Sequence, residues 1–203
     1  MKTRNIIASV IVFILLPMIS VLSYAESPIE IYDGWNQELK DYTAKICESY
    51  DVDYSLVLAV IYNESRFQSG KTHLNSNGTT DYGLMQVNEV NFDYLHKTIG
   101  INSMSDLLDD KTGIKCGVEL LAYHKDFTEN DSSALLRYQI GAGKYKKYQQ
   151  SGRTTNDVHS RVLEIKDEYS EYLESQKQQT DSGIYLEQNR ILKILNRWAE
   201  MLT

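Results

Sequence analysis

The sequence has an excess of acidic over basic residues and contains none of the common nucleotide-binding or serine-hydrolase motifs. Its 203 residues include 21 Lys plus Arg against 28 Asp plus Glu, a formal net charge of −7. Because nucleic acid is a polyanion, a protein that binds it normally has a stripe of basic residues, and this chain shows no such stripe. No P-loop, G-x-S-x-G turn or dinucleotide fingerprint occurs either. We therefore expect no nucleic-acid partner.

Cysteine is also scarce, which limits the metal and redox chemistry available to the chain. Cys47 and Cys116 are 69 positions apart and form neither a C-x-x-C redox pair nor a four-ligand zinc cage. The four histidines show no spacing typical of metal ligands, so we interpret each of them as structural. The sequence thus implies no metal and no cofactor.

Residues 1–25 have the pattern of a secretory signal peptide. Lys2 and Arg4 precede an apolar stretch from Ile6 to Leu22, and Ser23-Tyr24-Ala25 places small residues where signal peptidase reads them. An uncleaved membrane anchor is the alternative, because about 17 apolar residues are at the lower limit for crossing a bilayer. Pro17 and the small-x-small site favour cleavage. We therefore expect an extracytoplasmic protein.

Cleavage after Ala25 would leave 178 residues and, by removing two basic residues and no acidic one, change the formal charge from −7 to −9. An oxidising location would allow a disulfide between Cys47 and Cys116, which would contribute about 4 kcal/mol if it is unstrained. Two buried free thiols are the alternative, since the sequence does not show whether the two positions face each other. Both readings stay open at this stage.

Most of the remaining sequence has the periodicity of α-helices. Apolar residues at steps of three and four predict a helix over 31–50. Asp53 is a candidate N-cap for a second helix over 54–63, whose central residues are apolar without a break and therefore buried on all sides. Further helical stripes lie at 114–121, 158–172 and 191–202. The sequence predicts a single, mainly α globular domain.

Two polar segments interrupt this pattern. Residues 68–81 are rich in turn formers, with a candidate tight turn at Asn77-Gly78, and we expect them to loop across the surface. Residues 175–183 are polar and end in glycine, which predicts a linker between a domain over 30–174 and a C-terminal helix over 184–203. We expect this helix to pack on the domain; contact with another protein is the alternative.

Glu64 is the strongest candidate catalytic residue. It ends the most apolar run of the chain after the signal segment, and burial against apolar walls disfavours the charged form of a carboxyl group and raises its pKa. Such an acid can keep its proton near neutrality, as the general acid of a glycosidase must when the glycosidic bond breaks. Most glutamates at helix ends are solvated or cap the helix, so its position alone does not establish catalysis.

The segments around Glu64 resemble the lytic transglycosylase and goose-type lysozyme superfamily, which includes the catalytic domain of soluble lytic transglycosylases. Asn63-Glu64-Ser65-Arg66-Phe67 and Tyr82-Gly83-Leu84-Met85-Gln86-Val87-Asn88 are similar to its two signature segments. A third segment, 134–141 (ALLRYQIG), resembles the family's Ala-x-x-Tyr-Asn-Ala-Gly stretch. The likeness covers the chain from Glu38 to Tyr172 in the family's order.

This resemblance implies a lysozyme-like domain with a deep substrate groove, mainly α or α+β, in which Glu64 is the single catalytic glutamate. The residues expected to contact the sugar are Ser65, Met85, Gln86, Tyr138 and Gln139. Met85 would offer an apolar surface, Gln86 a donor and an acceptor, and Tyr138 a ring that stacks or a hydroxyl that bonds to Glu64. Roles as core filler, surface amide and core aromatic, respectively, are the alternatives.

The resemblance further implies cleavage of the bond between N-acetylmuramic acid and N-acetylglucosamine of peptidoglycan without water, which makes the enzyme a lyase that leaves a 1,6-anhydro end. A hydrolytic muramidase is the alternative, because a second carboxylate could align water. Asp81 is the candidate auxiliary acid, although we favour its interpretation as a solvated turn residue.

Departures from the family pattern keep a third alternative open. Gln139 stands where the family has Asn, Ile140 where it has Ala, and Val158 falls where a tyrosine is often found. A catalytically inactive module associated with the wall or with secretion would fit these changes. The expected partners are peptidoglycan glycan strands, with a protein as a further partner through the C-terminal helix, and the expected location is secreted and associated with the cell wall.

Overall fold

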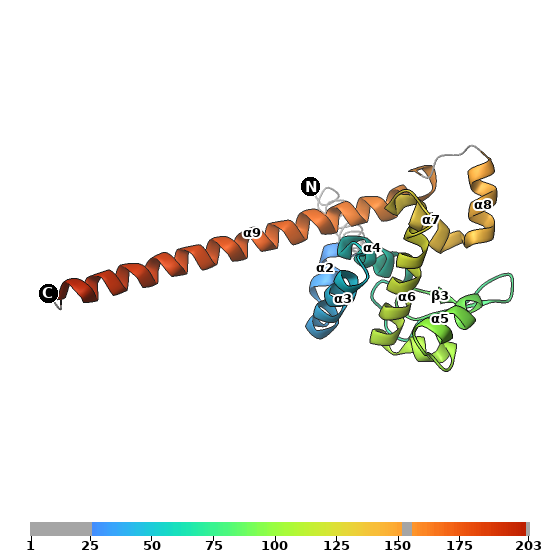
Figure 1. The fold of residues 1–203 in the computed structure, drawn as a ribbon, viewed down its shortest axis with the longest axis horizontal. Helices are drawn as coiled ribbons and strands as arrows, with labels where there is room; N and C mark the ends of the chain where they lie inside the picture. The colour runs from blue at the N-terminus through green and yellow to red at the C-terminus, as the bar shows by residue number, and fades with distance from the viewer. Residues whose placement is uncertain (1–25, 152–155, 202–203) are drawn as a thin grey trace, which may run out of the picture.

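The computed structural model describes residues 26–151 and 156–201, with side chains described for 26–151 and 161–193. The predicted signal peptide at 1–25 lies outside this range. Helices and strands follow one another as α2 Pro28–Asp33, α3 Gln37–Ser49, α4 Tyr54–Ser65, β1 Thr72–Leu74, β2 Thr80–Tyr82, β3 Val87–Asn88, η1 Glu89–Asn91, α5 Phe92–Thr98, η2 Met104–Leu108, α6 Asp110–Lys125, α7 Asp131–Ile140, α8 Ala142–Gln150 and α9 Asn156–Met201. The fold is mainly α, as predicted, with one small sheet (Figure 1).

Helix α4 is the centre of the domain. The Asp53 carboxylate accepts hydrogen bonds from the backbone N–H of Ser55 (2.8 Å) and Leu56 (3.3 Å), which confirms the predicted N-cap. Every residue from Ser55 to Tyr62 is buried, because other elements cover the helix on all sides. The helix ends where Arg66 adopts a left-handed conformation (φ 55°).

The single helix predicted over 31–50 is two helices in the structure. Helix α2 stops at Asp33, and α3 restarts at Gln37 after the Asn36 side chain accepts a hydrogen bond from the backbone N–H of Leu39 (3.2 Å). Asparagine competes for backbone donors in this way and so favours a helix start over a helix interior. The apolar periodicity continues across the break, which is why it did not reveal the break.

The polar segment after α4 forms a β-hairpin. Strands β1 and β2 pair antiparallel, with Thr72 opposite Tyr82 and Leu74 opposite Thr80, and β3 adds on the other side of β2. Gly78 lies in the connecting loop with φ 86°, a conformation that favours glycine, so the predicted turn at Asn77-Gly78 is confirmed in a five-residue loop. The pairing of β2 with β3 brings Asp81 beside Asn88.

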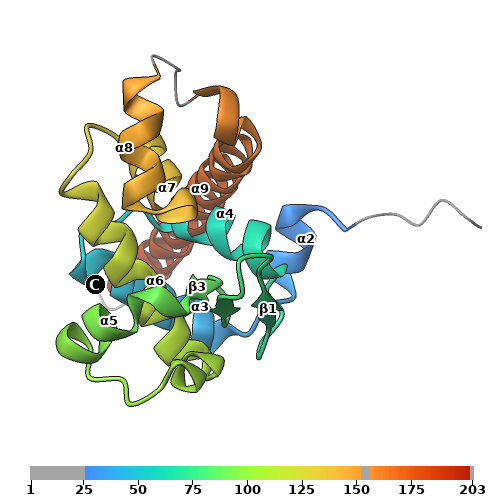
Figure 2. The same cartoon turned by 90° about the vertical axis from the view of Figure 1, so that its right-hand side faces the viewer.

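Helix α9 covers α4 with its N-terminal half (Figure 2). Val162, Ile165 and Tyr169 are buried in the core, and the Tyr169 hydroxyl donates a hydrogen bond to the Pro28 carbonyl at 2.8 Å. This confirms core packing for the stripe at 158–172, as far as its side chains are described. The bond also joins the helix to the start of the domain.

The C-terminal half of α9 differs from the prediction. Residues 175–183, predicted as a linker, are helical and continuous with the rest of α9. Their Ser, Gln and Lys side chains are compatible with a helix, and an internal glycine costs only about 1 kcal/mol. Figure 1 shows the helix extending away from the domain rather than packing on it, so the expectation that 184–203 pack on the domain is wrong for the described residues. The described apolar side chains in this C-terminal half of α9 are exposed.

Both cysteines are free and buried in the core, Cys47 on α3 and Cys116 on α6. Of the two alternatives, a disulfide or two buried free thiols, the structure therefore shows the free thiols. Among the described residues, no helix combines the length and apolar character that crossing a membrane requires.

Candidate active site

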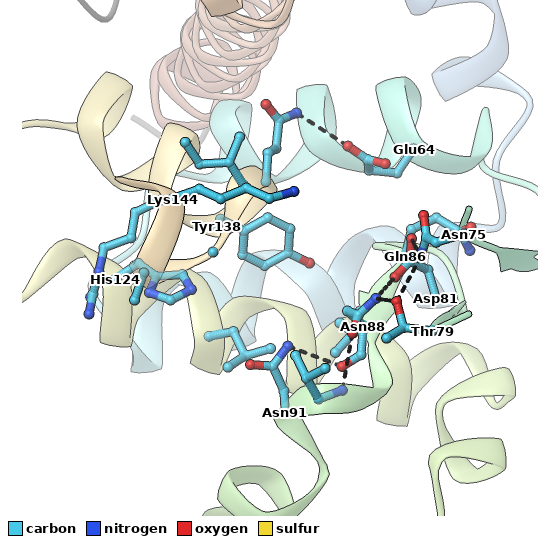
Figure 3. A pocket seen from close by; sticks show the side chains of 18 of the residues that line it. Glu64, Asn75, Thr79, Asp81, Gln86, Asn88, Asn91, His124, Tyr138 and Lys144 are labelled. Carbon is cyan, nitrogen blue, oxygen red and sulfur yellow. Dashed lines mark hydrogen bonds between the residues drawn. The ribbon is translucent and has the colours of Figure 1, made fainter. Parts of the chain in front are cut away.

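A cleft of about 690 Å³ opens between α4, the small sheet and the ends of α6, α7 and α8. Glu64, Asp81, Gln86, Tyr138 and Gln139, all predicted from the sequence, lie in its wall (Figure 3). The segments that carry them are far apart in the sequence. The fold therefore gathers the three signature segments around one cavity.

Glu64 projects from the last turn of α4 and is half-buried. Burial raises the pKa of its carboxyl group, and the charge of Asp81 adds to this effect, while hydrogen bonds from Asn63 and Gln139 oppose it. Both amides donate to the same oxygen, Oε1, at 3.1 Å from Asn63 and 3.3 Å from Gln139. No described residue donates to Oε2. The carboxyl group is thus held through one oxygen, while the other stays available for a proton.

The turn between β2 and β3 forms the floor of the cleft and fits tightly into the domain. Gly83 has φ 75°, and a Cβ there would lie 2.2 Å from the carbonyl oxygen of Leu107, so only glycine fits. Gln86 also has a positive φ (48°), and its Nε2 donates to the carbonyls of Gly83 (2.8 Å) and Lys71 (3.2 Å). These bonds fix the turn that presents Gln86 to the cleft.

Met85 and Ser65 do not lie where the resemblance placed them. Met85 is buried against Gly117 of α6, where a Cβ would lie 2.3 Å from its sulfur, so its side chain fills the core instead of meeting a sugar. The Ser65 side chain is buried too, and its hydroxyl donates to the Ile61 carbonyl at 3.0 Å. Met85 in the turn and Ser65 at the end of α4 are both fully buried and neither lines the cleft, so both assignments as sugar contacts are wrong for this structure.

Tyr138 and Gln139 lie at the end of α7, across the cleft from the turn. The Tyr138 hydroxyl donates to the Met85 carbonyl at 2.8 Å and makes no bond to Glu64. Its ring meets the edge of His124 at 6.1 Å between ring centroids. Tyr138 therefore holds the turn in place, while the longer Gln139 reaches Glu64 directly.

Asp81 is not the solvated turn residue that we favoured. It lies on β2, is half-buried and lines the cleft. Its two carboxylate oxygens accept one hydrogen bond each from side-chain amides, at 2.9 Å from Asn75 and 2.6 Å from Asn88. The pairing of β2 with β3 explains the position, because it sets Asp81 opposite Asn88. The cleft thus holds two carboxyl groups in different environments.

Comparison with known proteins decides the family. Residues 41–160 match the family model described as the transglycosylase SLT domain, which covers more than half of the chain. The chain belongs to this family. The resemblance to the lytic transglycosylase superfamily is thereby confirmed. The matched range contains Glu64 and all of the cleft residues named above.

Individual relatives of this SLT domain are more distant. Protein IpgF of Shigella flexneri is 27% identical over 121 residues, which make up 60% of this chain and 78% of that protein. Among solved structures, an inactive mutant of the lytic transglycosylase Slt from Pseudomonas aeruginosa is 19% identical, with a TM-score of 0.49. That match covers 62% of this chain and only 22% of the neighbour's chain.

The sequence reasoning did not single out several polar residues of this SLT cleft. Asn75, His124, Arg137 and Lys144 line it, and Asn88 binds Asp81. Asn88 and Arg137 lie inside the signature segments, so closer attention to those segments could have found them. Nothing in the local sequence marks Asn75, His124 or Lys144. Within the described ranges, no three His, Cys, Asp or Glu side chains gather as metal ligands would.

Proposed function

We propose that this protein is a secreted peptidoglycan lytic transglycosylase with Glu64 as its catalytic acid and base. Membership of the SLT family supports the reaction class. The observation that carries the assignment to Glu64 is its half-buried carboxyl group, which lines the cleft and whose pKa is raised by burial. A carboxyl group of this kind can carry a proton into the first step of the reaction.

In the first step, the protonated Glu64 donates its proton to the oxygen that joins N-acetylmuramic acid to N-acetylglucosamine. The bond between that oxygen and C1 of the muramic acid breaks, and the N-acetylglucosamine leaves with the proton. Oε2 suits this role, because the side-chain amides of Asn63 and Gln139 both donate to Oε1. Glu64 is then a carboxylate.

In the second step, the Glu64 carboxylate takes the proton from the C6 hydroxyl of the same muramic acid. The C6 oxygen forms a bond to C1 and closes a 1,6-anhydro ring, so no water is consumed. One carboxyl group serves both steps, because the nucleophile is part of the substrate and is already held near C1. Glu64 ends the cycle protonated and ready for the next bond.

Hydrolysis is the second candidate, and the position of Asp81 is the observation that favours it. Asp81 lines the same cleft as Glu64, and a hydrolytic glycosidase uses a second carboxylate to align water or to form a covalent intermediate. The amides of Asn75 and Asn88 donate to both oxygens of Asp81 and so orient its carboxylate. The two candidates differ in their products.

We expect Glu64→Gln to lose at least about 1,000-fold in activity on purified cell walls, because the amide keeps the shape of the side chain but has no acidic proton. Mass spectrometry of the released fragments should show 1,6-anhydro ends from the wild type. Glu48→Gln on the exposed face of α3 is the matched control and should stay fully active. Asp81→Asn should retain anhydro products if transglycosylation is correct.

Other outcomes would contradict this proposal. Fragments with reducing ends only, together with loss of activity in Asp81→Asn, would establish the hydrolase. Full activity of Glu64→Gln would remove Glu64 from the mechanism. Binding of cell walls by the wild type without released fragments would establish the inactive module.

The proposed location follows from residues 1–25, whose charged start, apolar stretch and small-x-small site are typical of a secretory signal. Peptidoglycan lies outside the cytoplasmic membrane, so the substrate and the signal agree. A cleaved signal is the form that we propose, with the protein associated with the cell wall. The membrane anchor remains the alternative.

A further inference from the structure

The cleft carries opposite charges on its two sides. Glu64 and Asp81 lie on the side of α4 and the sheet, while Lys144 and His124 lie on the side of α7 and α8 (Figure 3). Arg137 lines the cleft from α7 and adds a second positive charge there. We call Arg137, Lys144 and the first turn of α8 the basic side of the cleft. The proposed chemistry at Glu64 makes no use of it.

The first turn of α8 has unused backbone donors and borders this side of the cleft. Gly141 precedes the helix with φ 77° and ψ 156°, and no side chain caps the helix start. In the described parts of the chain, no backbone carbonyl accepts from the N–H of Ala142, Gly143 or Lys144. Free N–H groups and the helix dipole make such a start favourable for an anion. Gly141, Ala142 and Lys144 all line the cleft.

Two buried side-chain nitrogens at or beside the basic side have no hydrogen-bond partner. The Arg137 guanidinium lies 4.6 Å from the ring centroid of Phe127, and none of the ion pairs among the described residues involves it. Its Nη1 and the Nδ1 of His124 are buried without a hydrogen-bond partner, and His124 is only 8% exposed. Burial and the charge of Arg137 lower the pKa of His124 to about 4. His124 is therefore neutral at pH 7, and the positive charge belongs to Arg137 and Lys144.

A carboxylate is the ligand that this arrangement fits best. Guanidinium and ammonium groups bind carboxylates through charge-assisted hydrogen bonds, and helix starts bind them through backbone N–H groups. On a glycan strand, the amino sugars are acetylated and the lactyl group of muramic acid is joined to a peptide by an amide, so the sugar backbone is uncharged. The peptides attached to the strand do carry free carboxylates.

We propose that the basic side of the cleft binds a carboxylate of the peptide attached to the glycan, and that it selects peptide-bearing strands over bare ones. This inference rests on the proposed function, since it takes peptidoglycan as the substrate. It assigns Arg137 and Lys144 to substrate binding, a role separate from the bond-breaking step at Glu64. The selectivity is therefore expected in kcat/KM for strands that differ only in their peptides.

The test compares three preparations of the same glycan strands: with intact peptides, with the peptide carboxylates converted to amides, and with the peptides removed by an amidase and the lactyl carboxylates that this exposes converted to amides. Any phosphate on the strands survives both treatments. We expect the wild type to cleave intact strands about tenfold faster, in kcat/KM, than the other two preparations. Arg137→Gln/Lys144→Gln should lose this preference, so that its kcat/KM is similar on all three preparations. Lys146→Gln, also on α8 but outside the cleft, is the matched control and should keep the preference.

Lys144→Gln alone guards against misfolding, because Lys144 is exposed while Arg137 packs on aromatic rings. It should lose part of the preference. Equal rates of the wild type on all three preparations, or an equal loss by the double variant on all three, would overturn the proposal.

Binding separates this proposal from the proposed function. Glu64→Gln can be sedimented with each of the three preparations, since binding does not require cleavage. We expect intact strands to bind about tenfold more tightly than amidated strands, and this difference should disappear when Arg137→Gln/Lys144→Gln is added. If the wild type cleaves no strand but this difference in binding persists, the proposed function is wrong and carboxylate binding by the basic side is supported. Equal binding of intact and amidated strands would overturn carboxylate binding by the basic side.

Discussion

At the scale of single residues, the environment of Glu64 sets the pKa of its carboxyl group. Burial raises the pKa of its carboxyl group, and hydrogen bonds from the amides of Asn63 and Gln139 lower it by stabilising the charged form. The balance leaves the pKa above its ordinary value of 4.5. Gln139 replaces the asparagine of the family pattern, and its side-chain amide still donates a hydrogen bond to Glu64. Its extra methylene lets it reach the acid from α7.

We expect Gln139→Leu to shift the pH dependence of cleavage. Without the N–H donor, the charged form of Glu64 loses a hydrogen bond and its pKa rises further, so the alkaline limb of kcat/KM should move up by as much as about one pH unit. A pH profile on cell-wall fragments measures this. Gln68→Leu, an exposed position outside the cleft, is the control and should leave the limb in place. An unchanged or downward-shifted limb in Gln139→Leu would show that the bond does not act on Glu64.

At the scale of elements, the turn between β2 and β3 is placed by contacts with its neighbours. Gly117 leaves space on α6 for Met85, Gly83 lets the turn approach Leu107, and Tyr138 on α7 binds the Met85 carbonyl. This turn places Gln86 in the wall of the cleft, and the flanking strands β2 and β3 carry Asp81 and Asn88. The shape of the cleft therefore depends on packing behind it.

Gly117→Ala should destabilise the protein by about 1–3 kcal/mol, although alanine is the better helix former. Its Cβ would lie 2.3 Å from the sulfur and 2.7 Å from the Cβ of Met85 in a closed core, and overpacking of this kind outweighs helix propensity. Urea unfolding measures the difference. Gly143→Ala is the matched control, since nothing lies within 4 Å of its new Cβ, and it should be neutral or slightly stabilising. Equal stability of the two variants would mean that Met85 can move aside.

At the scale of the whole molecule, the N-terminal half of α9 packs on the domain and its C-terminal half extends away from it. Val162, Ile165 and Tyr169 close the core over α4. Farther along, Ile184, Tyr185, Leu186, Ile191 and Leu192 are between 49% and 69% exposed. A helix this far from the domain gains no stability from tertiary packing there. A protein partner for this half stays a prediction, because the structure shows only the uncovered side chains.

We expect deletion of 184–203 to change the melting temperature by less than about 2 °C, because none of its described side chains packs on the domain. Cleavage of glycan strands should also be unchanged, since the cleft lies at the other end of the structure. Tyr169→Ala is the contrasting variant in the same helix. It removes a buried ring and should cost about 3–5 kcal/mol. Calorimetry of both proteins measures the difference, and a large loss on deletion would show that the exposed half contributes to the fold.

The sequence alone determined the local features. Apolar residues at steps of three and four predicted most helices, and residue type predicted the Asp53 cap and the turn at Asn77-Gly78, because these features depend on neighbours within a few positions. It also marked Glu64 as the candidate acid, and the structure shows its carboxyl group half-buried with a raised pKa. The family followed from three short segments in the correct order.

Only the tertiary structure decided which side chains meet. The sequence did not show that Met85 and Ser65 face the core, that Asp81 is held by Asn75 and Asn88, or that the two cysteines stay apart as thiols. Nor did it show Arg137 and Lys144 on one side of the cleft. These arrangements join residues from different elements, and their distances depend on how helices and strands pack. Local periodicity carries no information about those distances.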